Sequence, residues 1–386
     1  MRNIAILGST GSIGRQTLDI IAEYDDRFRA CLLVANNNAD LLIEQSLRFL
    51  PDVVVIANQE HYAKVKDALA RKPIKVMCGN DAIADAVMAP EIDVVVTAMV
   101  GYSGLLPTIR AIEAGKVIAL ANKETLVVAG ELITGMLKES NSVLYPVDSE
   151  HGAFYQCMVG ERRSDVSKLI LTASGGPFWN KSVKELDNVT VADALNHPNW
   201  NMGAKITIDS ATMMNKGFEM IEARWLFDVM PQDIEIVVHR QSIVHSMVEF
   251  VDGSVKAQLG LPDMHLPIRY ALGLPSGRLS TPDYRMTIDD YANLTFERPD
   301  FAKFPLLRTA YEAAAHGGTA PCVVNAANEI AVAAFLNGEI GFKAISRLVD
   351  DALNHVELVK SPRYDDYVAV NAEARRYTQC RMKEIK

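Results

Sequence analysis

The sequence has few of the features that mark extracellular, membrane or nucleic-acid-binding proteins. Its five cysteines are scattered, with no Cys-x-x-Cys pair, which is typical of reduced thiols and not of a disulfide framework or a zinc site. No apolar run is long enough to span a membrane. The formal net charge is -9 without clustered Lys and Arg, so we expect neither nucleic acid nor a membrane as partner.

Two further absences bear on location and ligand class. The chain enters an apolar run at Ile4 and then a glycine-rich loop, so we expect no signal peptide. Together with the scattered cysteines, this predicts a cytoplasmic protein. The acidic balance does not exclude a small phosphorylated substrate, because such a ligand needs only a local basic or dipolar site.

The first part of the chain has the sequence pattern of a doubly wound α/β domain. Its 386 residues are 49% hydrophobic and 23% charged, enough for two or three globular domains. Apolar runs rich in Val and Ile predict buried parallel strands, and helical patterns such as Ile13–Tyr24 and Ala39–Phe49 separate them. The predicted strands are Asn3–Leu7, Ala30–Ala35, Val53–Ala57, Asp93–Ala98, Val117–Ala121 and Val143–Val147.

After Asp148 the pattern changes to α+β and then to helices. We expect strands at Lys168–Ala173, Ile234–Val238 and Val255–Leu259, and a helix at Thr212–Phe227. Little periodicity appears between Pro262 and Arg298. The predicted C-terminal helices are Leu306–His316, Val323–Leu336, Phe342–Leu353 and Val370–Arg381. The predicted domains are therefore 1–148 for a dinucleotide, 149–275 for catalysis, a linker at 276–300, and 301–386 as a small helical domain.

A glycine loop, Gly8–Gly14, stands between the first strand and the first helix. Glycine allows a tight turn and close approach of a pyrophosphate, which the helix N-terminus attracts through its free N–H groups. The spacing G-x-x-G-x-x-G favours dinucleotide binding in this context, although a purely structural turn is the alternative.

The end of the second strand lacks the acid that usually binds the ribose 2′-hydroxyl of NAD. Asn36, Asn37 and Asn38 stand there instead. They offer no cation to a 2′-phosphate either, but amide and backbone N–H groups can serve it.

Carboxylates follow the last strand of the first domain. Asp148 and Glu150 are two residues apart, so an extended backbone would place both on one face, outside the carboxyl end of the sheet. A divalent metal such as Mg²⁺ or Mn²⁺ would relieve their repulsion. The alternative is a solvated strand end with His151 as an incidental neighbour.

A third carboxylate belongs to the segment Asp209–Glu219. Ser210 is a favourable N-cap for the helix that follows. Asn215, Lys216 and Glu219 share one face of that helix by their spacing. A surface ion pair is the alternative interpretation, and the apolar neighbours Met213 and Met214 argue against it.

Seven strings, in order, carry a resemblance to the 1-deoxy-D-xylulose 5-phosphate reductoisomerases that extends over nearly the whole chain. They are Gly8–Gly14, Ala121–Glu124, Pro146–His151, Ser174–Phe178, His197–Trp200, Asp209–Glu219 with Ala223–Trp225, and Asn325–Glu329.

The resemblance implies site residues at matching positions. It implies metal ligands at Asp148, Glu150 and Glu219, with Lys123 joining them as catalytic residues. The implied contacts with substrate are Lys123, Ser149, Glu150, Ser174, His197, Trp200, Ser210, Asn215, Lys216 and Glu219, with Trp200 and Met202 in a flexible loop that closes over it. The implied contacts with cofactor are Thr10, Gly11, Ser12, Ile13, Asn36, Asn37, Asn38, Asn122, Glu124 and Gly203.

The resemblance also implies a reaction. A divalent metal (Mn²⁺, Mg²⁺ or Co²⁺) assists rearrangement of 1-deoxy-D-xylulose 5-phosphate, and NADPH then reduces the resulting aldehyde to 2-C-methyl-D-erythritol 4-phosphate, in the non-mevalonate isoprenoid pathway. A homodimer is implied as well. Two alternatives stay open from the residues: a simple NAD(P)-dependent dehydrogenase, which needs no carboxylate set, and a non-catalytic dinucleotide sensor, which needs no second-domain site.

The chain departs from the family at one cofactor position: relatives often carry a basic residue where Asn37 stands here.

Overall fold

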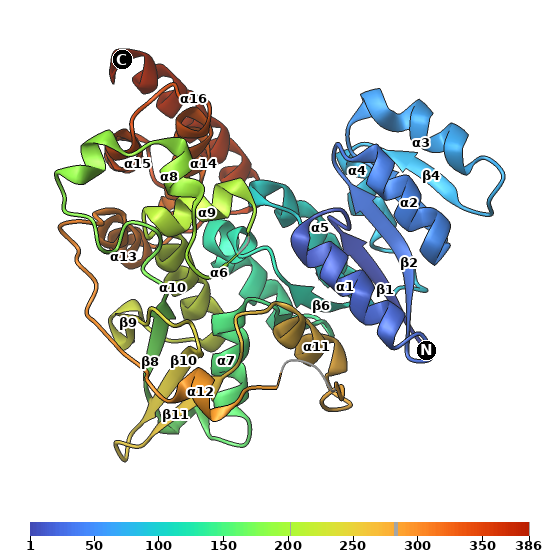
Figure 1. Cartoon of the computed structure of the whole chain (residues 1–386). Coiled ribbons are helices and arrows are strands. Elements are labelled where there is room, and N and C mark those ends of the chain that lie inside the picture. Colours follow the sequence, from blue (N-terminus) through green and yellow to red (C-terminus); the bar gives the residue numbers. More distant parts are fainter. Residues whose placement is uncertain (201, 282–284, 386) are drawn as a thin grey trace. The chain divides into compact units, whose positions relative to one another are not determined.

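The computed structural model describes residues 1–200, 202–281 and 285–385, so residues 282–284 of the predicted linker lie outside the described residues. The chain divides into two compact units (Figure 1). Unit 1 comprises Met1–Thr125, Ile133–Gly152 and Met264–Ser280. Unit 2 comprises Leu126–Leu132, Ala153–Asp263 and Thr281–Lys386.

Unit 1 is built on a seven-stranded, fully parallel sheet in the order β4-β3-β2-β1-β5-β6-β7. The order reverses between β1 and β5, which is where doubly wound sheets bind ligands. The strands are β1 (Arg2–Leu7), β2 (Phe28–Ala35), β3 (Val53–Ile56), β4 (Lys75–Cys78), β5 (Val94–Thr97), β6 (Val117–Leu120) and β7 (Val143–Pro146).

The helices of unit 1 follow the predicted alternation with strands. Burial of apolar faces such as Leu18, Ile21 and Leu42 against Ile4 and Leu33 of the sheet holds them in place. They are α1 (Ser12–Glu23), α2 (Ala39–Phe49), α3 (Tyr62–Leu69), α4 (Asn80–Ala86), α5 (Leu105–Glu113), α11 (His265–Gly273) and the two ends of α6 (Glu124–Lys138), whose middle residues Leu126–Leu132 belong to unit 2.

Unit 2 contains a four-stranded sheet in the order β11-β10-β8-β9. Strand β10 (Val244–Phe250) is antiparallel to β8 (Val166–Ala173) and β11 (Val255–Leu259), whereas β8 and β9 (Ile234–Val238) are parallel. The helices are α7 (Ser149–Met158), in which the boundary between units falls, α8 (Val191–Leu195), α9 (Ala204–Ala211), α10 (Met214–Phe227), α12 (Ile288–Tyr291), α13 (Leu306–His316), α14 (Ala320–Leu336), α15 (Phe342–His355) and α16 (Tyr364–Ile385).

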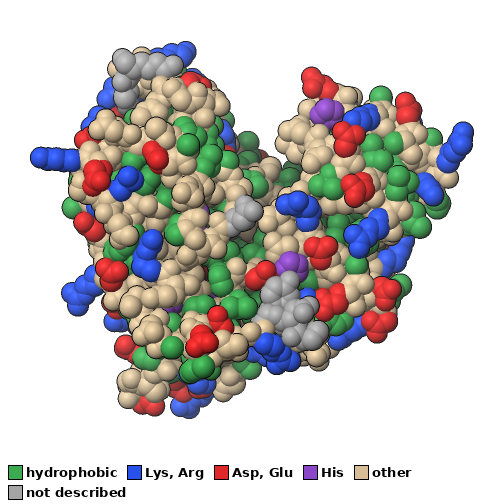
Figure 2. Space-filling view, in the orientation of Figure 1, with side chains coloured by type: hydrophobic (Ala, Val, Ile, Leu, Met, Phe, Trp, Pro, Cys, Tyr) green, Lys and Arg blue, Asp and Glu red, His purple; other side chains and the backbone are tan. Residues whose placement is uncertain are grey.

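The predicted fold class is confirmed: a Rossmann-like sheet, a second α+β part and C-terminal helices. Several elements were not predicted, among them β4, β10 and α11. Strand β4 is short and begins with an exposed Lys75, and β10 carries polar residues such as His245 and Glu249. Helix α11 lies in the stretch that lacked periodicity, and its first turn contains Pro267. In the described part of the chain, no helix has the length and apolarity to cross a membrane. Acidic and basic side chains are interspersed over the face shown in Figure 2.

Candidate active site

The glycine loop connects β1 to α1 as predicted, and two of its glycines are structurally required. Gly8 has φ +96°, and a Cβ there would lie 2.5 Å from the Ala98 carbonyl oxygen. A Cβ on Gly14 would lie 2.3 Å from the Gly8 carbonyl oxygen. Any larger residue would push the loop away from the sheet. The predicted cofactor residues Thr10, Gly11, Ser12 and Ile13 form this loop and the first turn of α1, whose N–H groups lack intrahelical partners.

The three asparagines after β2 are exposed, as a cofactor contact requires. The side-chain oxygen of Asn38 accepts the Leu41 N–H at 3.2 Å and so caps α2. The side-chain oxygen of Asn37 accepts a hydrogen bond from Asn58 at 3.0 Å. Asn36 contributes its backbone carbonyl, which accepts the Asn58 N–H at 3.1 Å.

Residues 122–124 follow β6 at the same end of the sheet, and all three are buried. The Asn122 amide donates to the carbonyls of Met99 and Gly101 at 2.8 and 3.0 Å, and its oxygen accepts the Thr125 hydroxyl at 2.5 Å. Asn122 therefore organises the loop after β5 from within. Its neighbour Glu124 accepts from the same amide at 3.1 Å.

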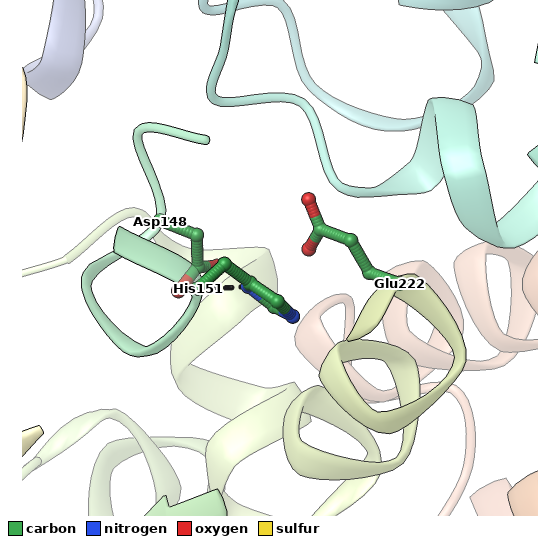
Figure 3. Close-up of side chains that lie close together, drawn as sticks. All are labelled: Asp148, His151 and Glu222. Atoms are coloured by element: carbon green, nitrogen blue, oxygen red, sulfur yellow. Dashed lines mark ion pairs between the residues drawn. The ribbon is translucent and has the colours of Figure 1, made fainter. Parts of the chain in front are cut away.

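Asp148 is held between two basic side chains of unit 1. Lys123 Nζ lies 2.7 Å from one carboxylate oxygen of Asp148. His151 Nδ1 lies 3.7 Å from the other oxygen, and Figure 3 marks this pair with a dashed line. Burial alone raises the pKa of Asp148, but Lys123 and His151 outweigh it and hold the pKa well below its usual range. Asp148 is therefore ionised, as a carboxylate must be to bind a metal.

Glu150 does not lie on an extended strand, so the period-two argument for it was wrong. Strand β7 ends at Pro146, and α7 begins at Ser149, which places Glu150 in the first turn of a helix. Its backbone N–H approaches Asp148 Oδ1 at 3.4 Å, and its side chain accepts the Ser149 hydroxyl at 2.6 Å. Both carboxylates thus gather at a helix N-terminus, where the dipole stabilises negative charge.

Helix α10 carries a buried polar cluster in unit 2, as the spacing predicted. Asn215 Nδ2 and Lys216 Nζ donate to separate oxygens of Glu219. Lys216 is 5% exposed and Glu219 1%, which contradicts the surface ion-pair interpretation. Glu222, one turn further along α10 and drawn in Figure 3, is fully buried as well.

Ser210 is not the N-cap of α10, so that prediction was wrong. It belongs to the last turn of α9, and the cap position of α10 is Met213 in a left-handed conformation, φ +63°. The chain turns sharply between α9 and α10, where the sequence predicted a single helix that begins after Ser210. Ser210 is half-buried, and its carbonyl is so near Gly176 that a Cβ on Gly176 would lie 2.4 Å from it.

Ser174 and His197 form a hydrogen-bonded pair whose proton positions follow from the neighbours. The His197 Nδ1 accepts the backbone N–H groups of Asn199 and Trp200, at 3.2 and 3.0 Å, so it carries no proton. Nε2 therefore holds the proton of the neutral ring and donates to Ser174 Oγ at 3.0 Å. Ser174 Oγ also accepts the Gly176 N–H at 3.2 Å, which leaves its own O–H to donate to a ligand.

Arg240 is a residue of this region that the sequence did not reveal. Its guanidinium donates to the carbonyls of Ser174 and Gly176, the latter at 2.9 Å, and so fixes the loop after β8. Its own backbone carbonyl accepts the side chain of Asn199 at 2.6 Å. One arginine thus connects the Ser174 loop to the loop that contains Trp200.

Asp209 and Asn328 were also missed as a pair. The Asp209 carboxylate, 1% exposed, accepts the Asn328 amide at 2.7 Å and lies 2.8 Å from Lys205 Nζ. Asn328 belongs to α14, whereas Asp209 precedes Ser210 in α9. The string Asn325–Glu329 gave a signal, but its partner could not be identified without the tertiary structure.

The predicted site residues are therefore divided between the two units. Unit 1 holds Lys123, Asp148, Ser149 and Glu150 with the glycine loop and the asparagines, and unit 2 holds the α10 cluster with Ser174, His197, Trp200, Gly203 and Ser210. The predicted metal ligands are divided in the same way, with Asp148 and Glu150 in unit 1 and Glu219 in unit 2. These three residues offer only oxygen donors, which suit Mg²⁺ or Mn²⁺.

Comparison with known families decides the assignment. Residues 4–130 match the family 1-deoxy-D-xylulose 5-phosphate reductoisomerase, residues 144–227 its C-terminal domain, and residues 259–377 the DXP reductoisomerase C-terminal domain. The 1-deoxy-D-xylulose 5-phosphate reductoisomerase of Porphyromonas gingivalis is 58% identical over 98% of this chain and 97% of its own. The chain belongs to the 1-deoxy-D-xylulose 5-phosphate reductoisomerase family.

Other reductoisomerases agree with this in sequence and in structure. The Bacteroides fragilis protein is 56% identical over 97% of this chain and 96% of its own. The Zymomonas mobilis reductoisomerase in complex with NADPH has 43% identity, a TM-score of 0.92 and 99% coverage of both chains. A reductoisomerase in complex with NADPH, fosmidomycin and magnesium has 38% identity and a TM-score of 0.95, with 99% of this chain and 98% of that one covered.

Proposed function

We propose that this chain converts 1-deoxy-D-xylulose 5-phosphate to 2-C-methyl-D-erythritol 4-phosphate, as an NADPH- and metal-dependent oxidoreductase of the non-mevalonate isoprenoid pathway. The observation that carries the proposal is the family match over 98% of the chain at 58% identity. Neither a simple dehydrogenase nor a dinucleotide sensor accounts for that match together with the buried polar clusters on α10 and around Asp148.

The glycine loop fits NADPH. Gly8 and Gly14 leave room at the start of α1 that a Cβ would fill, and the first N–H groups of α1 can receive a pyrophosphate. Solved relatives contain NADPH. In this proposal Thr10–Ile13 hold the pyrophosphate, Asn36–Asn38 the adenosine ribose, and Asn122, Glu124 and Gly203 the nicotinamide side. The reduced nicotinamide supplies the hydride.

The carboxylates fit a divalent cation by their charge and their hardness as ligands. Asp148 is held ionised, and Glu150 and Glu219 supply further oxygens. When bound, the cation supplies Lewis-acid stabilisation of negative charge on the substrate oxygens during the rearrangement. Lys123 adds positive charge beside Asp148, and we assign it to the same oxygens of the substrate. Ser149, which lies between Asp148 and Glu150 in the sequence, is assigned to them as well.

Unit 2 supplies the donors for the substrate phosphate. The Ser174 hydroxyl is left to donate because both of its acceptor positions are used by His197 and Gly176. We assign Ser210, Asn215 and Lys216 to the same phosphate. Trp200, which is half-buried with its ring 6.4 Å from that of His245, covers the bound substrate from the loop. Binding of the unreactive phosphate then orients the reacting carbons and excludes water.

The test is an assay with purified enzyme, 1-deoxy-D-xylulose 5-phosphate, NADPH and Mn²⁺. We expect loss of NADPH absorbance that depends on both substrate and metal, and a product with the mass of 2-C-methyl-D-erythritol 4-phosphate. Oxidation of NADPH with a product that keeps the unbranched carbon skeleton would identify a simple dehydrogenase and contradict the proposal.

Three further assignments belong to this proposal. Mn²⁺ is a suitable metal besides Mg²⁺, by the same donor chemistry. The enzyme acts as a homodimer, as the family resemblance implies, and sedimentation measures this. It works in the cytoplasm, which is supported by its five free cysteines, three of them buried.

A further inference from the structure

The ends of β2 and β3 are joined by backbone hydrogen bonds that continue past the sheet. Ala57 N–H donates to the Ala35 carbonyl at 2.9 Å, and Asn58 N–H donates to the Asn36 carbonyl at 3.1 Å. The Asn37 carbonyl in turn accepts the Ala39 N–H at 2.9 Å. The backbone at Asn37 and Asn58 is therefore fixed whatever their side chains are.

One backbone donor determines how both side-chain amides are oriented, that is, on which side each has its oxygen and on which its NH₂. Glu60 N–H donates to the side-chain oxygen of Asn58 at 3.0 Å, and a backbone N–H can only donate. The Asn58 amide must therefore direct its NH₂ elsewhere, and it donates to Asn37 Oδ1 at 3.0 Å. With its oxygen committed to Asn58, the Asn37 amide turns its own NH₂ away from Asn58, on an exposed side chain.

We propose that Asn58 is a positioning residue for cofactor specificity, which holds the Asn37 NH₂ toward the 2′-phosphate of NADPH. The inference rests on the proposed function, because that function places the adenosine ribose beside Asn36–Asn38. A phosphate only accepts hydrogen bonds, so an amide fixed as a donor favours it over the 2′-hydroxyl of NADH. A freely rotating amide would present its oxygen to the ribose as readily as its NH₂.

The other groups nearby explain why a neutral amide would carry this task. The Asn38 oxygen is committed to the cap of α2. The Lys64 ammonium lies 2.6 Å from Asp40, so its charge is largely balanced by a carboxylate at the start of α2. Arg15 in the first turns of α1 is exposed and is the rival candidate for binding the 2′-phosphate.

The test measures direct binding of NADPH and NADH, by nicotinamide fluorescence, to the full-length enzyme and its variants. Asn37→Ala and Asn58→Ala should each weaken NADPH about threefold to tenfold and leave NADH within about twofold, since one hydrogen bond is involved. The double variant should lose no more than Asn37→Ala alone, because Asn58 acts through Asn37. Gln59→Ala is the matched control: Gln59 is exposed in the same turn, and its replacement should change neither constant.

A second substitution separates orientation from simple loss of a contact. Asn58→Asp keeps the acceptor for the Glu60 N–H but has no hydrogen for Asn37, so the Asn37 amide should turn its oxygen outward. We expect a larger loss of NADPH affinity than for Asn58→Ala, most of which persists at 0.5 M salt. If the Asn58→Asp effect vanished at high salt, or was unchanged in the Asn37→Ala background, it would be a charge effect and the proposal would fail.

Two outcomes overturn the proposal directly. In the first, Asn37→Ala lowers the ratio of NADPH to NADH affinity but Asn58→Ala leaves it unchanged. In the second, neither of these variants changes the ratio, whereas Arg15→Ala lowers it. Binding is measured without substrate, so it is independent of turnover: failure of the wild-type enzyme to convert 1-deoxy-D-xylulose 5-phosphate would count against the proposed function and not against Asn58.

Discussion

The side chains of His197 and Ser174 meet at 3.0 Å between Nε2 and Oγ, while the other ring nitrogen of His197 accepts the backbone N–H of Trp200 at 3.0 Å. One imidazole therefore connects a proposed phosphate ligand to the loop that is proposed to cover the substrate. The connection needs a neutral ring with the proton on Nε2. Burial, with Arg240 as a further cause, lowers the pKa of His197 to about 4, which keeps the ring neutral at physiological pH.

We predict that His197→Phe raises KM for 1-deoxy-D-xylulose 5-phosphate about tenfold or more and leaves the Kd of NADPH unchanged. Phenylalanine fills the same space but removes two to three hydrogen bonds, each of which contributes on the order of 1 kcal/mol. Steady-state kinetics and cofactor titration measure the two effects. An unchanged KM would show that the loop and Ser174 are organised without His197.

The same histidine chemistry predicts how stability depends on pH. Burial lowers the pKa of His245 to about 4, as it does for His197. Since the folded pKa lies below the unfolded value of about 6.5, the stabilisation is fully present above pH 6.5 and is lost as pH falls toward 4. Urea unfolding at pH 7.0, 6.0 and 5.0 should show a falling free energy of unfolding. His245→Gln should flatten this slope; an identical slope in the variant would contradict the assignment.

Removal of the metal should abolish turnover, and Mn²⁺, Mg²⁺ or Co²⁺ should restore it after EDTA treatment. Asp148→Asn and Glu219→Gln each remove one charge with little change of shape, and we expect kcat/KM to fall at least about 100-fold, because even indirect partners of a metal contribute 10- to 100-fold. Circular dichroism and thermal melting control for folding. Near-normal activity in either variant would remove that residue from the ligand set.

The hydrogen bond from Asn328 to the buried Asp209 predicts a combined effect on stability and substrate binding. Asn328→Ala leaves a buried carboxylate with one donor fewer, which costs about 1.5–3 kcal/mol of unfolding free energy. Because Asp209 precedes Ser210, we also expect KM for the substrate to rise while the Kd of NADPH stays constant. Lower stability with an unchanged KM would mean that Asp209 is only structural and does not position Ser210.

The sequence predicted best those features that depend on residues close together along the chain. The glycine loop, the strand runs of unit 1 and the i, i+3 and i+4 cluster of Asn215, Lys216 and Glu219 all follow from local periodicity. Strand β10 was missed because polar residues such as His245 and Glu249 interrupt its apolar pattern, although tertiary burial stabilises it as a strand.

The errors at the site have one physical cause, which is abrupt change of backbone direction. Met213 adopts a left-handed conformation that separates α9 from α10, and the position lacks the glycine or asparagine that would have predicted it. Similarly, α7 begins three residues after β7 ends, so Glu150 is helical. Partners far apart in sequence, such as Asn328 with Asp209 or Asn58 with Asn37, could not be inferred because one sequence does not encode their pairing in any local pattern.

A charge at position 37 should strengthen and change the discrimination between cofactors. Asn37 offers the 2′-phosphate a neutral donor, whereas a lysine there would also place a positive charge beside the phosphate, a gain of about 0.5–2 kcal/mol or roughly 2- to 30-fold in affinity. We therefore expect Asn37→Lys to tighten NADPH by that factor, to leave NADH nearly unchanged, and to make the NADPH affinity more sensitive to salt, because screening weakens exposed charge pairs. Titration of both cofactors at two ionic strengths measures all three effects.

Wild-type enzyme should still prefer NADPH, since no acid at the end of β2 repels the phosphate. An unmoved ratio of NADPH to NADH affinity in Asn37→Lys would transfer the recognition of the phosphate to Arg15 or Lys64, and the pairing of Lys64 with Asp40 makes Arg15 the stronger of the two.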